Sequence, residues 1–207
     1  MKDAEELLRA TLLKVPGGLA EHVIRVVAEV QRLADIHGVD REAATIAALG
    51  HDLLRAHSNE RLLAIAVEQG YALDPADEME PILLHGPLAV QILQERYGIL
   101  DGDVLGAVAY HTTANEGMTP LQKLVFIADK IEPQKLGQLP AVRIIAELAE
   151  RDLDEAMLAY LDYHLRRAIE RGWPLHSHTV AARNELLSQQ RAAISERRDA
   201  EAFRERP

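Results

Sequence analysis

Cysteine is absent from the 207 residues of the chain, which excludes disulfide bonds, thiolate zinc sites and a cysteine nucleophile. Aromatic residues make up only 4% of the sequence, in which alanine and leucine dominate. Because pleated sheets prefer β-branched and aromatic side chains, this composition favours helices. Any metal ligands in the chain must be histidine and carboxylate side chains.

Several other features are missing. No apolar run is long enough to span a bilayer, and the first residues, from Met1 to Glu6, lack the apolar core of a signal peptide. The sequence contains no glycine-rich phosphate loop and no internal repeat. We therefore expect a cytoplasmic protein that does not act at a membrane.

Positive charge is also in short supply. The formal net charge is -10, so most of the surface should repel nucleic acid, and we expect no nucleic-acid partner. A small polyanionic substrate would need metal ions or a few well-placed arginine and lysine side chains.

Hydrophobic residues make up 48% of the sequence, which is enough for one sizeable core. Apolar periodicity, N-cap residues and glycine stops predict a series of helices, with a linker from Asp74 to Pro81 and a final charged stretch that frays. The predicted helices cover residues 3–14, 19–37, 41–52, 59–69, 86–97, 104–111, 120–132, 142–149, 153–171 and 179–198.

One stretch organises the chain: the helix through Ala47 and Ala48 ends in Gly50-His51-Asp52, with Arg55 one turn further on. An imidazole and a carboxylate side by side can hold a divalent metal ion. A His-Asp dipeptide alone often occurs by chance, so it gains meaning only if further ligands arrive at other helix ends.

Such ligands are found. His22 lies in the first turn of a predicted helix, His85 at the entrance of one, and His111 at the end of an apolar face. Asp129 lies on an apolar face, where a carboxylate is costly unless it is paired with cations. A helical bundle can bring these positions to one cleft, where four histidines and two aspartates could hold two metal ions bridged by Asp52.

Two metal ions suit phosphate-ester and anhydride hydrolysis. They lower the pKa of a bridging water toward about 7 and neutralise charge on the phosphoryl oxygens. Arg55 could then stabilise the charge that grows on the leaving or equatorial oxygens.

This ordered pattern resembles the HD-domain metal-dependent phosphohydrolases, and more narrowly the bacterial YqeK-like family of symmetrical diadenosine tetraphosphate hydrolases. The resemblance covers residues 19–184, and the pieces specific to the narrower family are His111-Thr112-Thr113 and Ala128-Asp129-Lys130-Ile131-Glu132-Pro133. The other matching pieces are His22, Gly50-His51-Asp52, His85-Gly86 and Arg183-Asn184.

The resemblance implies an all-α, HD-domain helical bundle over residues 19–190, with a helical extension over 1–18 and a charged tail over 191–207. It implies two divalent or mixed-valence metal ions, iron before manganese or another transition metal, and cleavage of diadenosine tetraphosphate into two ADP. The implied metal ligands are His22, His51, Asp52, His85, His111 and Asp129. The implied substrate contacts are Arg55, Thr112, Lys130, Arg183 and Asn184.

Some positions depart from the family pattern. Arg55 stands where the family usually has lysine, Ala114 where a glycine commonly follows the His-Thr-Thr motif, and Leu19 where an arginine usually stands. These departures leave the metal ligands intact and bear on substrate preference.

Other interpretations stay open. Lys130 is equally explained as a cation that favours its helix C-terminus, Arg183 as part of a surface ion pair, and His164 as a core residue. His176 and His178 are explained as loop residues, with substrate contact as the alternative. The substrate could instead be a nucleoside mono- or triphosphate or a signalling nucleotide, or the protein could bind nucleotides without turnover. The alanine- and leucine-rich late helices could pair in a homodimer.

Overall fold

The computed structural model describes residues 2–136 and 140–204, with the backbone alone from residue 197 onward. Every regular element in these ranges is a helix, which confirms the predicted all-α class. In chain order the helices are α1 (Lys2–Leu12), α2 (Gly17–His37), α3 (Arg41–Gly50), α4 (Asn59–Gln69), α5 (Pro75–Met79), the 3-10 turn η1 (Pro81–Leu84), α6 (His85–Tyr97), α7 (Gly102–Tyr110), α8 (Pro120–Ile131), α9 (Pro133–Leu136), α10 (Pro140–Ala149), α11 (Leu153–Arg171) and α12 (Ser177–Arg204).

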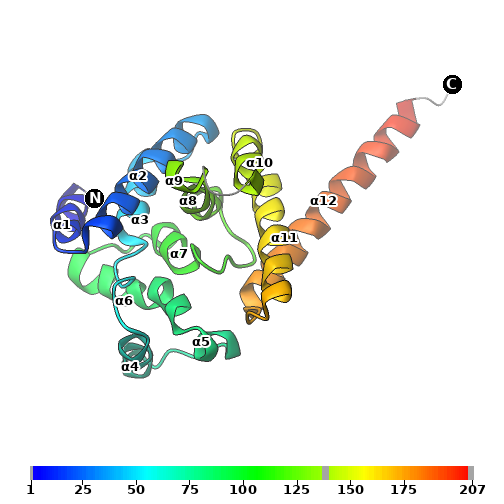
Figure 1. Cartoon of the computed structure of the whole chain (residues 1–207). Coiled ribbons are helices and arrows are strands. Elements are labelled where there is room, and N and C mark those ends of the chain that lie inside the picture. The colour runs from blue at the N-terminus through cyan, green and yellow to red at the C-terminus, as the bar shows by residue number, and fades with distance from the viewer. Residues whose placement is uncertain (1, 137–139, 205–207) are drawn as a thin grey trace.

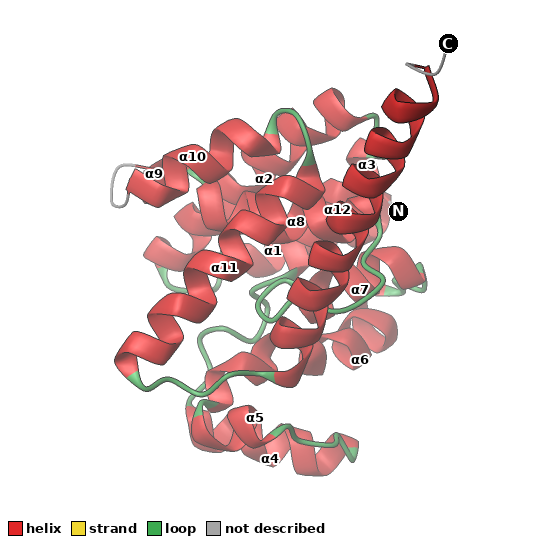
Figure 2. Cartoon of the chain, turned by 90° about the vertical axis from the view of Figure 1, so that its right-hand side faces the viewer, coloured by secondary structure: helices red, strands yellow, loops and turns green. Residues whose placement is uncertain are grey.

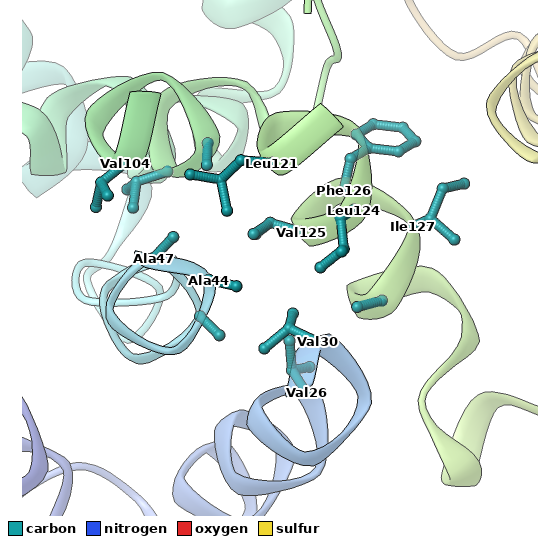
Figure 3. Packing of buried hydrophobic residues seen from close by; sticks show 14 of the residues in the cluster. Val26, Val30, Ala44, Ala47, Val104, Leu121, Leu124, Val125, Phe126 and Ile127 are labelled. Carbon is teal, nitrogen blue, oxygen red and sulfur yellow. The ribbon is translucent and has the colours of Figure 1, made fainter. Parts of the chain in front are cut away.

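The core lies where α2, α3, α7 and α8 meet (Figure 3). In Figure 3, Ala44 of α3 points into the space between α2 and α8, and Ala47 points toward Val104 of α7; their small side chains let the neighbouring helices approach closely. α8 is buried on more than one side. In Figure 3 its Leu124 and Val125 point toward α2 and α3, whereas Phe126 and Ile127 point away from them, and the Phe126 ring centroid lies 5.4 Å from that of Tyr160 on α11. Because these helices carry the predicted ligands near their ends, the core fixes where those ends lie.

Local capping sets the helix boundaries much as the sequence predicts. The Asp40 side chain accepts hydrogen bonds from the amides of Glu42 and Ala43 at 2.8 and 3.1 Å, which starts α3. Thr119 caps α8 in the same way, with Pro120 at the first helical position. The ends that deliver the predicted ligands are therefore determined locally.

The predicted linker from Asp74 to Pro81 is wrong, because α5 and η1 occupy it. Asp74 accepts a hydrogen bond from the amide of Ala76, while the Asp77 side chain accepts one from the amide of Asp74 at 2.9 Å. This is a capping box followed by a proline at the first helical position, so Asp74-Pro75 starts a helix and does not mark a loop.

The last helix is also longer than predicted. α12 begins at Ser177 and reaches Arg204, beyond the expected end near Arg198. Its first half packs against α11, and its second half projects from the body of the molecule in both views (Figures 1 and 2). Within residues 2–136 and 140–204, no helix combines the length and the hydropathy needed to cross a membrane.

Candidate metal centre and substrate cavity

The first predicted ligand pair comes from the end of α3. His51 is fully buried, and its Nδ1 donates a hydrogen bond to the carbonyl oxygen of Ala48 at 2.7 Å. This bond fixes the tautomer and leaves Nε2 with a free lone pair. Nε2 is buried and has no hydrogen-bond partner, which is unusual for a buried polar atom and calls for an explanation.

The facing ends of α6 and α7 bring His85 and His111 together. Nδ1 of His111 donates to the carbonyl of Val108 at 2.7 Å, and Nδ1 of His85 donates to the carbonyl of Ile82. The two Nε2 atoms lie 2.9 Å apart. Two neutral rings with donating Nδ1 atoms would place two lone pairs against each other at this distance.

His22, the fourth histidine of the cluster, is oriented in the same way. His22, near the start of α2, turns Nδ1 toward the Glu132 carboxylate at 3.5 Å and Nε2 toward Asp129 Oδ1 at 3.1 Å. In all four histidines, therefore, Nδ1 faces an oxygen acceptor and Nε2 faces the centre of the cluster. Metal-binding histidines show this arrangement, since the outer acceptor fixes the ring and raises its basicity.

Asp52 lies between two halves of the cluster. Its Oδ2 is 3.5 Å from Nε2 of His51 and 3.6 Å from Nε2 of His22. Its Oδ1 is 3.1 Å from Nε2 of His85 and 3.8 Å from Nε2 of His111. One carboxylate thus faces both halves, as a bridging ligand must.

Asp129 completes the half that contains His22 and His51. Both of its carboxylate oxygens accept hydrogen bonds from lysines, Oδ2 from Lys130 at 2.6 Å and Oδ1 from Lys135 at 2.9 Å. Burial pushes the pKa of Asp129 upward, but the positive charge of Lys130, the hydrogen bond from His22 and the charge of Lys135 outweigh it, so the pKa lies well below its usual range.

The pKa shifts of Asp52 and His111 also favour the protonation states that bind metal ions. Burial raises the pKa of Asp52, and the neighbouring imidazoles of His51 and His85 more than reverse the effect, so Asp52 stays ionised. Burial lowers the pKa of His111 well below its usual value, with His85 adding to the effect. Ionised carboxylates and neutral imidazoles are the forms that bind metal ions.

These residues fit a metal centre on three observations. Nε2 of His51 is buried without a hydrogen-bond partner, and the Nε2 atoms of His85 and His111 lie 2.9 Å apart. In each of two groups of three residues, the possible ligand atoms lie within 4.8 Å of one another. A separation near 3 Å is what adjacent donors have around an octahedrally coordinated ion with bonds of about 2.1 Å. The two groups are His22 with His51 and Asp129, and His51 with Asp52 and His111.

The cluster opens into a cavity of about 450 Å³. Arg55 lies exposed at this cavity, and Lys130 and Lys135 add two more cations to its wall. The Thr112 hydroxyl also lines it, 3.0 Å from Nε2 of His111. Asp52 and Asp129 line the same cavity, so its three cations outnumber its carboxylates by one, and in a chain of net charge -10 they form a local site for a polyanion.

The structure does not bring every predicted substrate contact to this cavity. Arg183, on α12, donates from Nε to Asp162 on α11 at 2.8 Å, and neither Arg183 nor Asn184 lines the cavity. Of the predicted contacts, Arg55, Thr112 and Lys130 line it.

Sequence reasoning did not single out two residues that belong to this region. Lys135 follows the Asp-Lys-Ile-Glu-Pro run, and its role depends on the short helix α9, which turns the chain back over Asp129. Arg25 donates from Nε to Glu132 at 2.7 Å and so orders the acceptor of His22. The sequence signal that could have identified Arg25 is its position one helical turn after His22.

Fold and site together define a class: an all-helical protein whose helix ends bring histidine and aspartate side chains to one buried cluster that could hold metal ions, beside a cationic cavity. The sequence profile of the HD domain matches residues 19–134. The chain belongs to the HD-domain family.

Individual relatives are similar over most of their length. A protein of Halalkalibacterium halodurans named symmetrical bis(5'-nucleosyl)-tetraphosphatase is 32% identical, with 83% of this chain and 90% of that protein covered. The Bacillus subtilis protein of the same name is 30% identical, with coverages of 81% and 88%. A crystal structure from Clostridium acetobutylicum, titled a predicted HD superfamily hydrolase involved in NAD metabolism, is 33% identical with a TM-score of 0.84, covering 89% of this chain and 97% of that one.

Proposed function

We propose that the protein is a symmetrical bis(5'-nucleosyl)-tetraphosphatase, which cleaves diadenosine tetraphosphate at its central anhydride to give two ADP. The observation that carries this proposal is the convergence of the six predicted ligand side chains in one cluster, five of which line the cationic cavity. The names of the relatives from Halalkalibacterium halodurans and Bacillus subtilis support the choice of substrate.

The proposed cofactor is a pair of metal ions, with iron the first candidate and manganese or another transition metal the alternative. His22, His51 and Asp129 would hold one ion, His85 and His111 the other, and Asp52 would bridge them. When bound, such a pair lowers the pKa of a water and neutralises charge on the phosphoryl oxygens.

The residues of the chain provide binding and charge stabilisation. Lys130 and Lys135 attract the polyphosphate to the cavity, and the Thr112 hydroxyl can donate to a phosphoryl oxygen. Arg55 is exposed at the same cavity, so its guanidinium is free to pair with two oxygens of one phosphate. Contacts from Arg183 and Asn184, the homodimer and the cytoplasmic location stay predictions.

Product analysis tests the reaction directly. The purified protein should convert each diadenosine tetraphosphate into two ADP, with no AMP or ATP among the products. Release of AMP and ATP, or faster hydrolysis of a nucleoside mono- or triphosphate or of a signalling nucleotide, would reject the symmetrical tetraphosphatase. Hydrolysis that persists unchanged in Asp52→Ala would reject the metal centre as its source, and no hydrolysis at all would favour a nucleotide-binding protein.

A further inference from the structure

A second cavity, of about 410 Å³, adjoins the cationic one. The two cavities share Ile82, Thr112 and Lys130 in their walls. The volume is within the range of small-molecule binding sites, which are commonly lined by aromatic groups with a few polar ones. The sequence pattern placed Thr112 and Lys130 at the substrate but assigned no ligand to the aromatic side chains of this cavity.

Aromatic rings form one side of this cavity. Tyr160 and His164 of α11 are stacked with their planes 12° apart and their centroids 6.0 Å apart. Trp173, just after α11, lines the same cavity and is 41% exposed. His164 is half-buried, and its burial, together with the nearby charges of Lys130 and Arg167, lowers its pKa, so the ring stays neutral and can both donate and accept hydrogen bonds.

We propose that this cavity, defined by Tyr160, His164 and Trp173, is the nucleoside site of the enzyme, where one base of the dinucleotide lies against the aromatic rings. The inference rests on the proposed function, which supplies a substrate with a base at each end. It adds a place for that base and names the side chains that recognise it.

The structure of the substrate requires a base-binding site next to the metal centre. In symmetrical cleavage, only one phosphate and a ribose separate the attacked phosphorus from the nearest base. The base must therefore lie in a cavity that directly adjoins the metal centre, as this one does. Lys130, in the shared wall, donates to the carbonyl of His111 at 3.0 Å and lies 5.9 Å from the centre of the Tyr160 ring, between the phosphate and base positions.

The chain contains a single tryptophan, Trp173, so all of its tryptophan fluorescence comes from a side chain that lines this cavity. Excitation at the red edge of indole absorption avoids absorption by adenine. ADP should change the emission of the wild-type protein saturably, whereas pyrophosphate, which fills only the phosphate positions, should not. Constant emission while calorimetry detects ADP binding, or no ADP binding at millimolar concentration, would overturn the proposal.

Variants separate a binding role from a structural one. His164→Ala and Trp173→Ala should weaken ADP binding, and raise KM for diadenosine tetraphosphate, by about tenfold or more, as expected for loss of a base–aromatic contact. Pyrophosphate affinity and kcat should change far less. Leu175→Ala is the matched control, because Leu175 is 43% exposed close to Trp173 and does not line the cavity.

Wild-type ADP affinity and KM in both His164→Ala and Trp173→Ala would overturn the nucleoside site. The failure of the proposed function has a different signature. If diadenosine tetraphosphate is not split into ADP but ADP still changes the Trp173 emission, the substrate is wrong and the nucleoside site stands.

Discussion

Gly86 lies at the closest approach between two helix ends. A Cβ atom at this position would lie 2.8 Å from the carbonyl oxygen of Val108 and 3.1 Å from Cε1 of His111. Both neighbours belong to the end of α7 that presents His111 to His85. The glycine is therefore what allows the two imidazoles to meet.

Gly86→Ala should push α6 and α7 apart. We expect a loss of stability of about 1–3 kcal/mol, as for an overpacked core, together with reduced metal content. Thermal unfolding and elemental analysis measure the two effects. Gly102→Ala is the control, because a Cβ there meets nothing within 4 Å. Wild-type metal content and stability in Gly86→Ala would contradict this account of the site.

Glu132 has a positioning role. It is 1% exposed, accepts a hydrogen bond from Arg25 and faces Nδ1 of His22. Glu132→Gln keeps the shape but removes the charge that orients the imidazole, so metal affinity should fall by about 10- to 100-fold. Competition with a chromogenic chelator measures this affinity. The control variant is Glu150→Gln, at an exposed glutamate, and it should bind metal with wild-type affinity. Equal metal affinities in the two variants would refute the role of Glu132.

Arg55 is expected to act on the substrate and not on the metal. Arg55→Ala should lower kcat by about 100-fold, the scale found when one donor to a developing negative charge is removed. Metal content should stay at the wild-type level. Arg61→Ala, on the exposed Arg61–Glu68 ion pair, should leave kcat unchanged. Metal loss in Arg55→Ala would show that the side chain supports the centre.

At the level of single residues, part of the candidate site could be predicted from the sequence. The predicted ligands at helix ends could be found because histidine and aspartate lie next to helix caps and glycine stops in the sequence. Ala114 adopts φ 60, a left-handed conformation that glycine adopts most easily, which explains why the family commonly has glycine there. Lys135 could not be found, because only the turn made by α9 brings it to Asp129.

At the scale of elements, α8 connects the core to the site. Leu124 is fully buried, and Asp129 lies on the same helix a little over one turn later. Leu124→Ala should lower the free energy of unfolding by about 2–5 kcal/mol. Leu100→Ala, at a side chain 77% exposed, should change it by less than about 0.5 kcal/mol. Denaturant titration compares them, and equal effects would contradict the assignment of the core.

The observed helix boundaries agree with those predicted from N-cap residues and glycine stops wherever these signals were interpreted correctly. The error at α5 arose because Asp-Pro was interpreted as a loop signal, although the same pair is a good N-cap and first helical residue. The length of α12 was underestimated because its second half has little apolar periodicity, and residues 188–196 are exposed, so the sequence offers no packing signal there.

At the scale of the whole molecule, which helix ends meet could not be worked out from periodicity. His22 and Asp129 are far apart in the sequence and come within 3.1 Å only because α2 and α8 pack together. The resemblance to a known family supplied this information in advance. Composition alone would have left the ligands as separate histidines and aspartates.

Metal binding at the centre should stabilise the entire fold, since a ligand that binds only the folded state shifts the unfolding equilibrium. At about 1,000 times the dissociation constant this is about 4 kcal/mol, so chelation should lower Tm by about 10 °C. Differential scanning calorimetry with and without chelator measures the shift. Asp52→Ala should show little shift, and an equal shift in both proteins would point to metal bound elsewhere.

The central claim is that six side chains from separate helices hold a pair of metal ions. Anomalous diffraction from crystals of the purified protein, collected at the absorption edge of the metal identified by elemental analysis, tests it most directly. The account predicts two peaks about 3.5–4 Å apart, with Asp52 between them and His22, His51, His85, His111 and Asp129 around them. A cluster without anomalous density, or density only at other residues, would contradict it.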